Sequence, residues 1–250
     1  VARILLTLAE GERKAEVSRE VLVDNNDFDP YQLFRYIDSQ GKNRIDACDI
    51  CSYLGSKGIN CTDDEAQLII LFFDADADGS LSYCEFLTLV QPKNGTKKGV
   101  SNLNSNGRIP YHVDYSFSKL LEKELELAQI IISLLNEIRT RCDFNIHGIF
   151  HLLKDWNNIT EDSLREFLNR NNLNFLESDL GFMLKRIDLN KDGQADLCEF
   201  HAFLGFPSCT RCCPCSKSCV CGCVCCSSCC ANCHASDNNQ RNQSNQRSQN

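Results

Sequence analysis

Apolar side chains recur every three or four residues along most of the first 205 positions, and this period predicts amphipathic helices. The first helix is expected within residues 1–22, where the apolar stripe includes Val17 and Val21. Pro30 fits the first turn of a second helix, and another helical pattern runs from residue 62 to 73. We therefore predict an all-α fold for this part of the chain.

The longest helical pattern covers residues 116–142 and would measure about 40 Å if unbroken. It carries two neighbouring apolar stripes, and only Glu124 interrupts the first of them. A helix that is apolar over so wide an arc must be covered on two sides. One stripe could dock onto a partner, but the pattern favours packing inside the molecule, because wide stripes are commonly part of the core.

Two twelve-residue stretches, 74–85 and 188–199, place oxygen-bearing side chains at alternating positions, a glycine at position 6 and a glutamate at position 12. This is the pattern of a calcium-binding loop. Positions 1, 3 and 5 supply side-chain oxygens, position 7 a backbone carbonyl, position 9 often a bridging water, and position 12 a bidentate carboxylate. The predicted ligands are Asp74, Asp76, Asp78, Ser80, Ser82 and Glu85 in the first stretch, and Asp188, Asn190, Asp192, Gln194, Asp196 and Glu199 in the second.

Each of these loops follows a loop of similar placement but different chemistry. Residues 38–49 have the right length, but Lys42 puts a cation at position 5 and Asp49 is short for bidentate binding at position 12. Residues 154–163 look like a loop shortened to ten residues. Neither is expected to bind calcium, so we predict two calcium ions in all. Each defective loop is expected to pair with its intact neighbour through one short backbone contact, Ile45 with Leu81 and Ile159 with the small Ala195.

The second half of the chain thus repeats the first, and both halves resemble the EF-hand superfamily, of which calmodulin is the familiar two-lobed example. The resemblance implies two pairs of hands. We expect an N-terminal pair with its leading helix in residues 1–90, a linker in 91–114, the long helix with a C-terminal pair in 115–205, and an irregular tail in 206–250. Residues 108–124, placed between the two pairs, also resemble EF-hand proteins of protist cilia. That narrower resemblance implies attachment to axonemal microtubules.

Charge and cysteine content separate the body of the chain from the tail. Residues 1–205 hold 33 acidic against 22 basic side chains, which argues against nucleic acid as a partner and suits cation binding. Cysteines in the body are scattered singly, so a reducing, cytoplasmic compartment is expected. No apolar run approaches the ~20 residues that span a bilayer. The first residue is Val1 rather than methionine, which leaves open whether residues precede it.

Twelve of the 18 cysteines lie between Cys209 and Cys233. Their close spacing resembles metallothionein, which implies bound zinc or copper, and it also resembles cysteine-string proteins, which implies acyl chains that anchor the tail to a membrane. A reduced, unstructured tail is the third possibility. The sequence leaves all three open.

No phosphate-binding loop, nucleophile elbow or kinase motif occurs, so an enzyme is not expected. The function predicted from the sequence is calcium-responsive binding to a specific protein partner. Met183 is the only methionine, whereas adaptable target surfaces are rich in methionine, so promiscuous binding is disfavoured. A structural axonemal protein in which calcium stabilises the fold is the alternative, and metal handling by the cysteine-rich tail is a second alternative.

Overall fold

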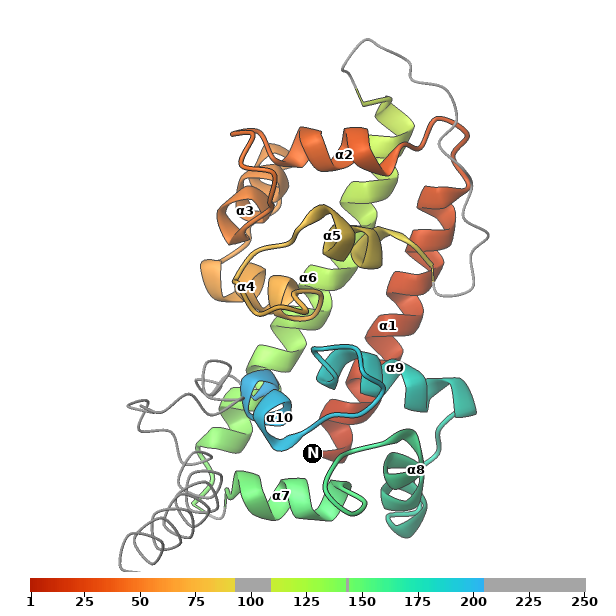
Figure 1. The fold of residues 1–250 in the computed structure, drawn as a ribbon, viewed down its shortest axis with the longest axis vertical. Helices are drawn as coiled ribbons and strands as arrows, with labels where there is room; N and C mark the ends of the chain where they lie inside the picture. Colours follow the sequence, from red (N-terminus) through yellow and green to blue (C-terminus); the bar gives the residue numbers. More distant parts are fainter. Residues whose placement is uncertain (93–108, 143, 205–250) are drawn as a thin grey trace, which may run out of the picture. The chain divides into compact units, whose positions relative to one another are not determined.

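A computed structural model (Figure 1) describes residues 1–92, 109–142 and 144–204 of the chain. The regular structure within these ranges is helical, as predicted, and no helix among them is long and apolar enough to cross a membrane. Most of the predicted linker and the whole cysteine-rich tract lie outside the described residues. The helices are α1 (Ala2–Val23), α2 (Pro30–Ile37), α3 (Ala47–Ser56), α4 (Asp63–Leu71), α5 (Tyr83–Val90), α6 (Tyr111–Arg139), α7 (Ile146–Leu153), α8 (Glu161–Arg170), α9 (Glu177–Ile187) and α10 (Leu197–Phe203).

The described chain divides into two compact units, one of residues 1–195 and one that begins at Asp196. Helices α1 to α9 belong to the first unit, and α10 belongs to the second. The division falls inside the stretch 188–199. The two parts of that predicted calcium loop are therefore described separately below.

Single backbone bridges join neighbouring loops within the first unit. Ile45 pairs with Leu81 through N–H to carbonyl bonds of 2.9 and 2.7 Å, and Ile159 pairs with Ala195 through two bonds of 2.8 Å. Both pairings were predicted from the loop spacing, and both are confirmed. The small side chain of Ala195 does not prevent its bridge from forming.

Helix α6 begins five residues earlier than predicted, at Tyr111, directly after Pro110, and it ends at Arg139 rather than at Cys142. The segment 111–114 was assigned to the linker because polar and aromatic residues hide its period. Its inward positions are nevertheless filled in helical register, since Val113 and Phe117 are both buried. The proline explains the start, because its missing N–H costs nothing at the beginning of a helix.

The apolar face of α6 packs inside the molecule, as the pattern favoured. Helix α6 runs beside α1 and also contacts α4 (Figure 1). The Phe117 ring lies 5.2 Å from the ring of Tyr53 on α3 and 6.0 Å from that of Phe86 on α5, between centroids. The Tyr53 hydroxyl donates a hydrogen bond of 2.9 Å to Asp114. Helix α6 therefore covers the apolar side of the first pair of hands.

The expected apolar stripe on α1 is wrong at two positions, because Val17 and Val21 are exposed. The inward face of this helix instead contains Glu12 and Arg19, both fully buried. A pattern that scores charge as surface cannot place these two residues inside. They are buried because each finds oppositely charged partners on other helices.

A closed ring of charges, which we call the ionic core, joins α1, α6 and α9. Arg19 donates to Glu12 and to Glu124, both at 2.8 Å, and Arg186 bonds the same two carboxylates, approaching Glu124 to 2.9 Å. Lys185 is a further partner of Glu12. Burial by itself would raise the pKa of Glu12, but Arg186, Arg19 and Lys185 outweigh burial and hold that pKa well below its usual range. Glu124, which interrupted the predicted stripe, is therefore a core residue.

Candidate calcium sites

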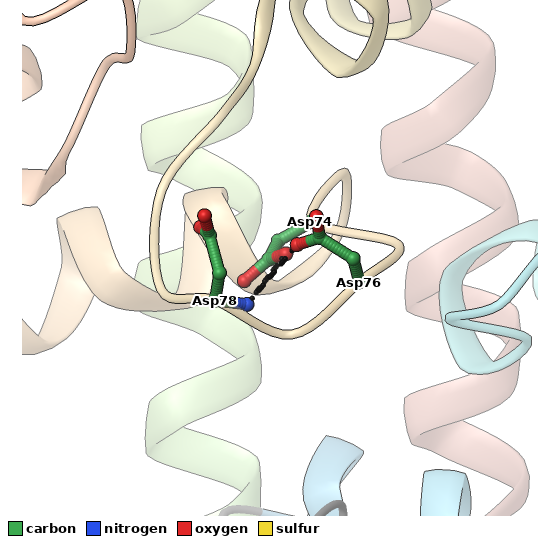
Figure 2. A group of neighbouring side chains, drawn as sticks. All are labelled: Asp74, Asp76 and Asp78. Atoms are coloured by element: carbon green, nitrogen blue, oxygen red, sulfur yellow. Dashed lines mark hydrogen bonds between the residues drawn. The ribbon is translucent and has the colours of Figure 1, made fainter.

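The first predicted calcium loop connects α4 to α5 and gathers three aspartates on one turn (Figure 2). One carboxylate oxygen from each of Asp74, Asp76 and Asp78 lies within 4.8 Å of the others. Asp74 is buried, whereas Asp76 and Asp78 are exposed. Such a set of hard oxygen donors, open to solvent on one side, fits a divalent cation of the calcium type.

Backbone hydrogen bonds hold the acidic loop in place. The N–H of Gly79 donates to Asp74 at 2.8 Å, and the N–H of Asp78 donates to both Asp74 and Asp76 at 3.2 Å. Burial raises the pKa of Asp74 to about 6, and the carboxylate of Glu85 adds to the rise. The loop thus concentrates negative charge that these N–H groups only partly offset, and a cation would complete the neutralisation.

Glu85, at position 12, already faces the start of the loop. One of its oxygens accepts the N–H of Ala75 at 2.8 Å, and the other accepts the N–H and the hydroxyl of Ser82 at 2.8 and 2.7 Å. Ser82 and Glu85 also form the capping box of α5. Two predicted ligands therefore also fix the first turn of the exiting helix. Ser80, the predicted carbonyl ligand, is buried and donates to Asp78.

The first part of the second loop reproduces this framework. Asp188 is buried, and it accepts the N–H of Gly193 at 2.8 Å and that of Asp192 at 3.2 Å. Asn190 accepts the N–H of Asp192 at 2.8 Å, and Asp192 accepts the N–H of Gln194 at 3.0 Å. These bonds connect the same loop positions as those around Asp74. Within residues 188–195, the predicted ligands thus lie in the same local arrangement as in the first loop.

The remaining part of the second loop begins the second unit. Asp196 accepts the N–H of Glu199 at 2.8 Å, and Glu199 accepts the N–H of Asp196 at 2.9 Å. This capping box starts α10 as Ser82 and Glu85 start α5. The predicted ligands at positions 9 and 12 are thus again the cap of an exiting helix.

Comparison with known proteins agrees with these features. Residues 28–91 and residues 157–204 each match the family model of an EF-hand domain pair. The chain contains two EF-hand domain pairs. A stretch of 59 residues is also 39% identical to the probable calcium-binding protein CML41 of Arabidopsis thaliana. That match covers 24% of this chain and 29% of the relative, so it spans less than a third of the relative's length. The predicted resemblance to the EF-hand superfamily is confirmed.

The first hand of this EF-hand protein keeps the loop backbone but carries its own cation. Asp38 accepts the N–H groups of Lys42 and Asn43 at 2.8 and 2.7 Å, as Asp74 accepts those at positions 5 and 6. The Lys42 ammonium then bonds Asp46 and Asp49, the latter at 2.8 Å. Those hydrogen bonds raise the pKa of Lys42 above its usual range. The ammonium of Lys42 thus neutralises the acids at positions 9 and 12.

Backbone angles show the same relation between the first hand and the two intact ones. Position 4 has a positive φ in all three loops, 69° at Gly41, 56° at Ala77 and 63° at Lys191. Position 6 does too, at 59° for Asn43, 84° for Gly79 and 90° for Gly193. Only glycine adopts such angles without strain, and asparagine is the next most tolerant residue. The calcium-loop conformation is therefore present whether or not position 5 carries a carboxylate.

The loop of the third hand departs from this conformation, as its shortened length predicted. Asp155 and Asn158 close a tight turn on each other, with N–H to carbonyl bonds of 2.9 and 3.1 Å. Trp156 within the turn has a φ of 51° and is 90% exposed. The turn is joined to its neighbouring loop by the Ile159 bridge and by a hydrogen bond of 2.7 Å that the Asn158 amide donates to the Gln194 side chain.

Proposed function

We propose that this protein binds two calcium ions, one at residues 74–85 and one at 188–199, and that it binds a protein partner in a calcium-responsive way. The main support is the convergence of Asp74, Asp76 and Asp78, whose carboxylate oxygens lie within 4.8 Å of one another. Bound there, a calcium ion would supply two positive charges to a loop in which burial and the Glu85 carboxylate disfavour the ionised form of Asp74. The repeated framework around Asp188 supports the second site.

The response can pass from the loop to the helices through Glu85. This side chain caps α5, and the next residue, Phe86, contacts both Phe34 and Phe117, with ring centroids 5.5 and 6.0 Å apart. A change in the bonds of Glu85 would therefore move the start of α5 against α6. Because α6 covers the apolar side of the first pair, such movement would alter which apolar side chains a partner can reach.

Calorimetric titration of the full chain with calcium tests the ion count. Wild type is expected to bind two ions, the single variants Glu85→Gln and Glu199→Gln one each, and the double variant none, since each change removes the bidentate carboxylate. Glu20→Gln, on an exposed face of α1, is the matched control and should bind two. Four ions or none in wild type, or an unchanged count in the double variant, would overturn the assignment.

A second candidate function is that calcium stabilises a permanently closed fold and does not change its conformation. The burial of Phe117 between Tyr53 and Phe86 favours it, as does the ionic core that joins three helices. Hydrogen exchange of the α6 amides separates the two candidates. Faster exchange with calcium would support opening toward a partner, and slower exchange would support stabilisation of the closed fold. The axonemal location stays a prediction from resemblance alone.

A further inference from the structure

One ammonium group connects the segments that lead into the two candidate calcium loops. Lys191 stands at position 4 of the second loop, between the predicted ligands Asn190 and Asp192, and is not itself a ligand. Its Nζ donates to the carbonyls of Asp188 at 2.9 Å, Lys185 at 3.0 Å and Phe72 at 3.2 Å. Phe72 lies two residues before Asp74 in the first loop. All three donors of the ammonium are thus used, and one of them crosses to the other pair of hands.

A second contact joins the same two segments. The guanidinium of Arg186, two residues before Asp188, lies over the rings of Phe72 and Phe73 at 4.8 and 5.1 Å from their centroids. All three side chains are buried, so this cation–π contact is shielded from water. Phe73 directly precedes Asp74. The residues that lead into the two loops are therefore packed against each other.

The ionic core contacts these packed residues through Arg186. Arg186 is fixed by Glu12 and Glu124, which also hold Arg19. Arg19 in turn donates to the carbonyl of Leu89 at 2.7 Å, near the end of α5. The entering side of the first intact hand thus contacts Arg186 of α9, and the exiting side contacts Arg19, which shares Glu12 and Glu124 with Arg186. A displacement of either loop must be accommodated by the other or must break buried charge contacts.

From these contacts we infer that Lys191 and Arg186 are positioning residues that couple calcium binding at the two loops. An ion that holds Asp74 also holds the backbone at Phe72, two residues earlier. The Phe72 carbonyl accepts a hydrogen bond from Lys191, so this bond then restrains Lys191, which lies between Asn190 and Asp192. The second loop then loses less freedom when its own ion binds, so the coupling is positive. It acts equally in both directions, because coupling between binding sites is reciprocal. This inference rests on the proposed function, namely that both loops bind calcium.

The experiment follows the amide resonances of Gly79 and Gly193 in the full chain during calcium titration, so that each loop reports its own affinity. The affinity of the first loop is compared between wild type and Glu199→Gln, and that of the second between wild type and Glu85→Gln. Each is expected to weaken by about 5-fold or more when the other loop is disabled, by the same factor in both directions. The same comparisons in a Lys191→Met background should give factors near one, with two ions still bound.

Matched variants separate positioning from a general loss of stability. Lys191→Arg keeps a cationic donor and should restore most of the coupling. Lys123→Met, which removes a partly exposed lysine of α6, should leave the coupling unchanged. If Lys191→Met does not fold, Phe72→Leu tests the same junction by removing the ring beneath Arg186, and should lower the coupling factor.

The failures of this inference and of the proposed function are distinguishable. Two bound ions with independent affinities in wild type would overturn the coupling and leave the proposed function standing. Coupling that survives in folded Lys191→Met would overturn the role of Lys191. Absence of calcium binding at either loop would overturn the proposed function, and the coupling with it.

Discussion

Removing one carboxylate from the ionic core should cost a large part of the stability of the fold. In Glu124→Gln the shape of the side chain is kept, but Arg19 and Arg186 lose a shared anion that each approaches to 2.8–3.0 Å. All three side chains are almost completely buried. Removing one partner of such a buried group leaves an uncompensated charge and costs about 3–5 kcal/mol. Since whole domains are stable by only about 5–15 kcal/mol, the variant should unfold at a much lower denaturant concentration.

The magnitude can be checked against a neighbour on the same helix. Glu126 pairs with Lys123 at 2.8 Å but is about half exposed, so Glu126→Gln should cost less than about 1 kcal/mol. Adding Arg19→Met to Glu124→Gln removes one charge of each sign, and the double variant should be more stable than the sum of the single effects by about 1–3 kcal/mol.

Urea denaturation, followed by far-ultraviolet circular dichroism without calcium, measures these free energies of unfolding. Repeating it in excess calcium should shift all variants together, because ligand binding stabilises the folded state by mass action. If Glu124→Gln lies within 1 kcal/mol of Glu126→Gln, or if the double variant is simply additive, the ring does not act as a buried charge network.

Three further predictions concern pH, packing and the first hand. The pKa of Glu12 is depressed in the folded state, so its stabilising contribution is complete above about pH 4.3, the ordinary glutamate value, and is lost as the pH falls below it. Urea denaturation at pH 7, 4.5 and 3 should therefore show a smaller loss of unfolding free energy on acidification for Glu12→Gln than for wild type. A Cβ on Gly11 would lie 2.5 Å from a leucine methyl of α6, so Gly11→Ala should destabilise the fold by about 1 kcal/mol. Gly55 has open space around it, so Gly55→Ala should stabilise the fold slightly. Thermal unfolding compares the two variants, and equal effects would contradict the close approach of α1 to α6. Replacing Lys42 by Asp together with Asp49→Glu should raise the calorimetric calcium count by one, and an unchanged count would show that the loop backbone alone does not make a site.

The elements of the fold were predictable where local rules decide them. The loop spacing correctly gave the Ile45–Leu81 bridge, and the helical period gave the long buried helix. The start of that helix was misplaced, because proline and polar residues at 110–115 resemble a linker. The ionic core could not be predicted, since burial of Glu12 or Arg19 depends on partners more than a hundred residues away. The local sign of it was Glu124, which interrupts the apolar stripe of the long helix.

The candidate sites show a similar division. The sequence predicted which side chains would gather at 74–78, because the motif fixes both backbone and ligands over a few residues. It identified Lys42 as incompatible with a metal, but the bonds of that ammonium to Asp46 and Asp49 required the folded loop. The bond from Lys191 to Phe72 was beyond prediction, because it joins segments 119 residues apart and depends on how the helices pack.

The loops also separate two properties that the calcium motif combines, the conformation of the backbone and the charge of the ligands. The first hand has the conformation with an internal ammonium, and the loop at 74–85 has the same conformation with carboxylates held by backbone N–H groups. Since the first hand has this conformation with an ammonium at position 5, the backbone shape does not require a carboxylate at that position. Calcium bound at the first intact loop would act on the groups next to that loop, namely the cap of α5 and the packed side chains of Phe72 and Arg186. Whether calcium opens the protein or stabilises its closed form should therefore depend on these contacts.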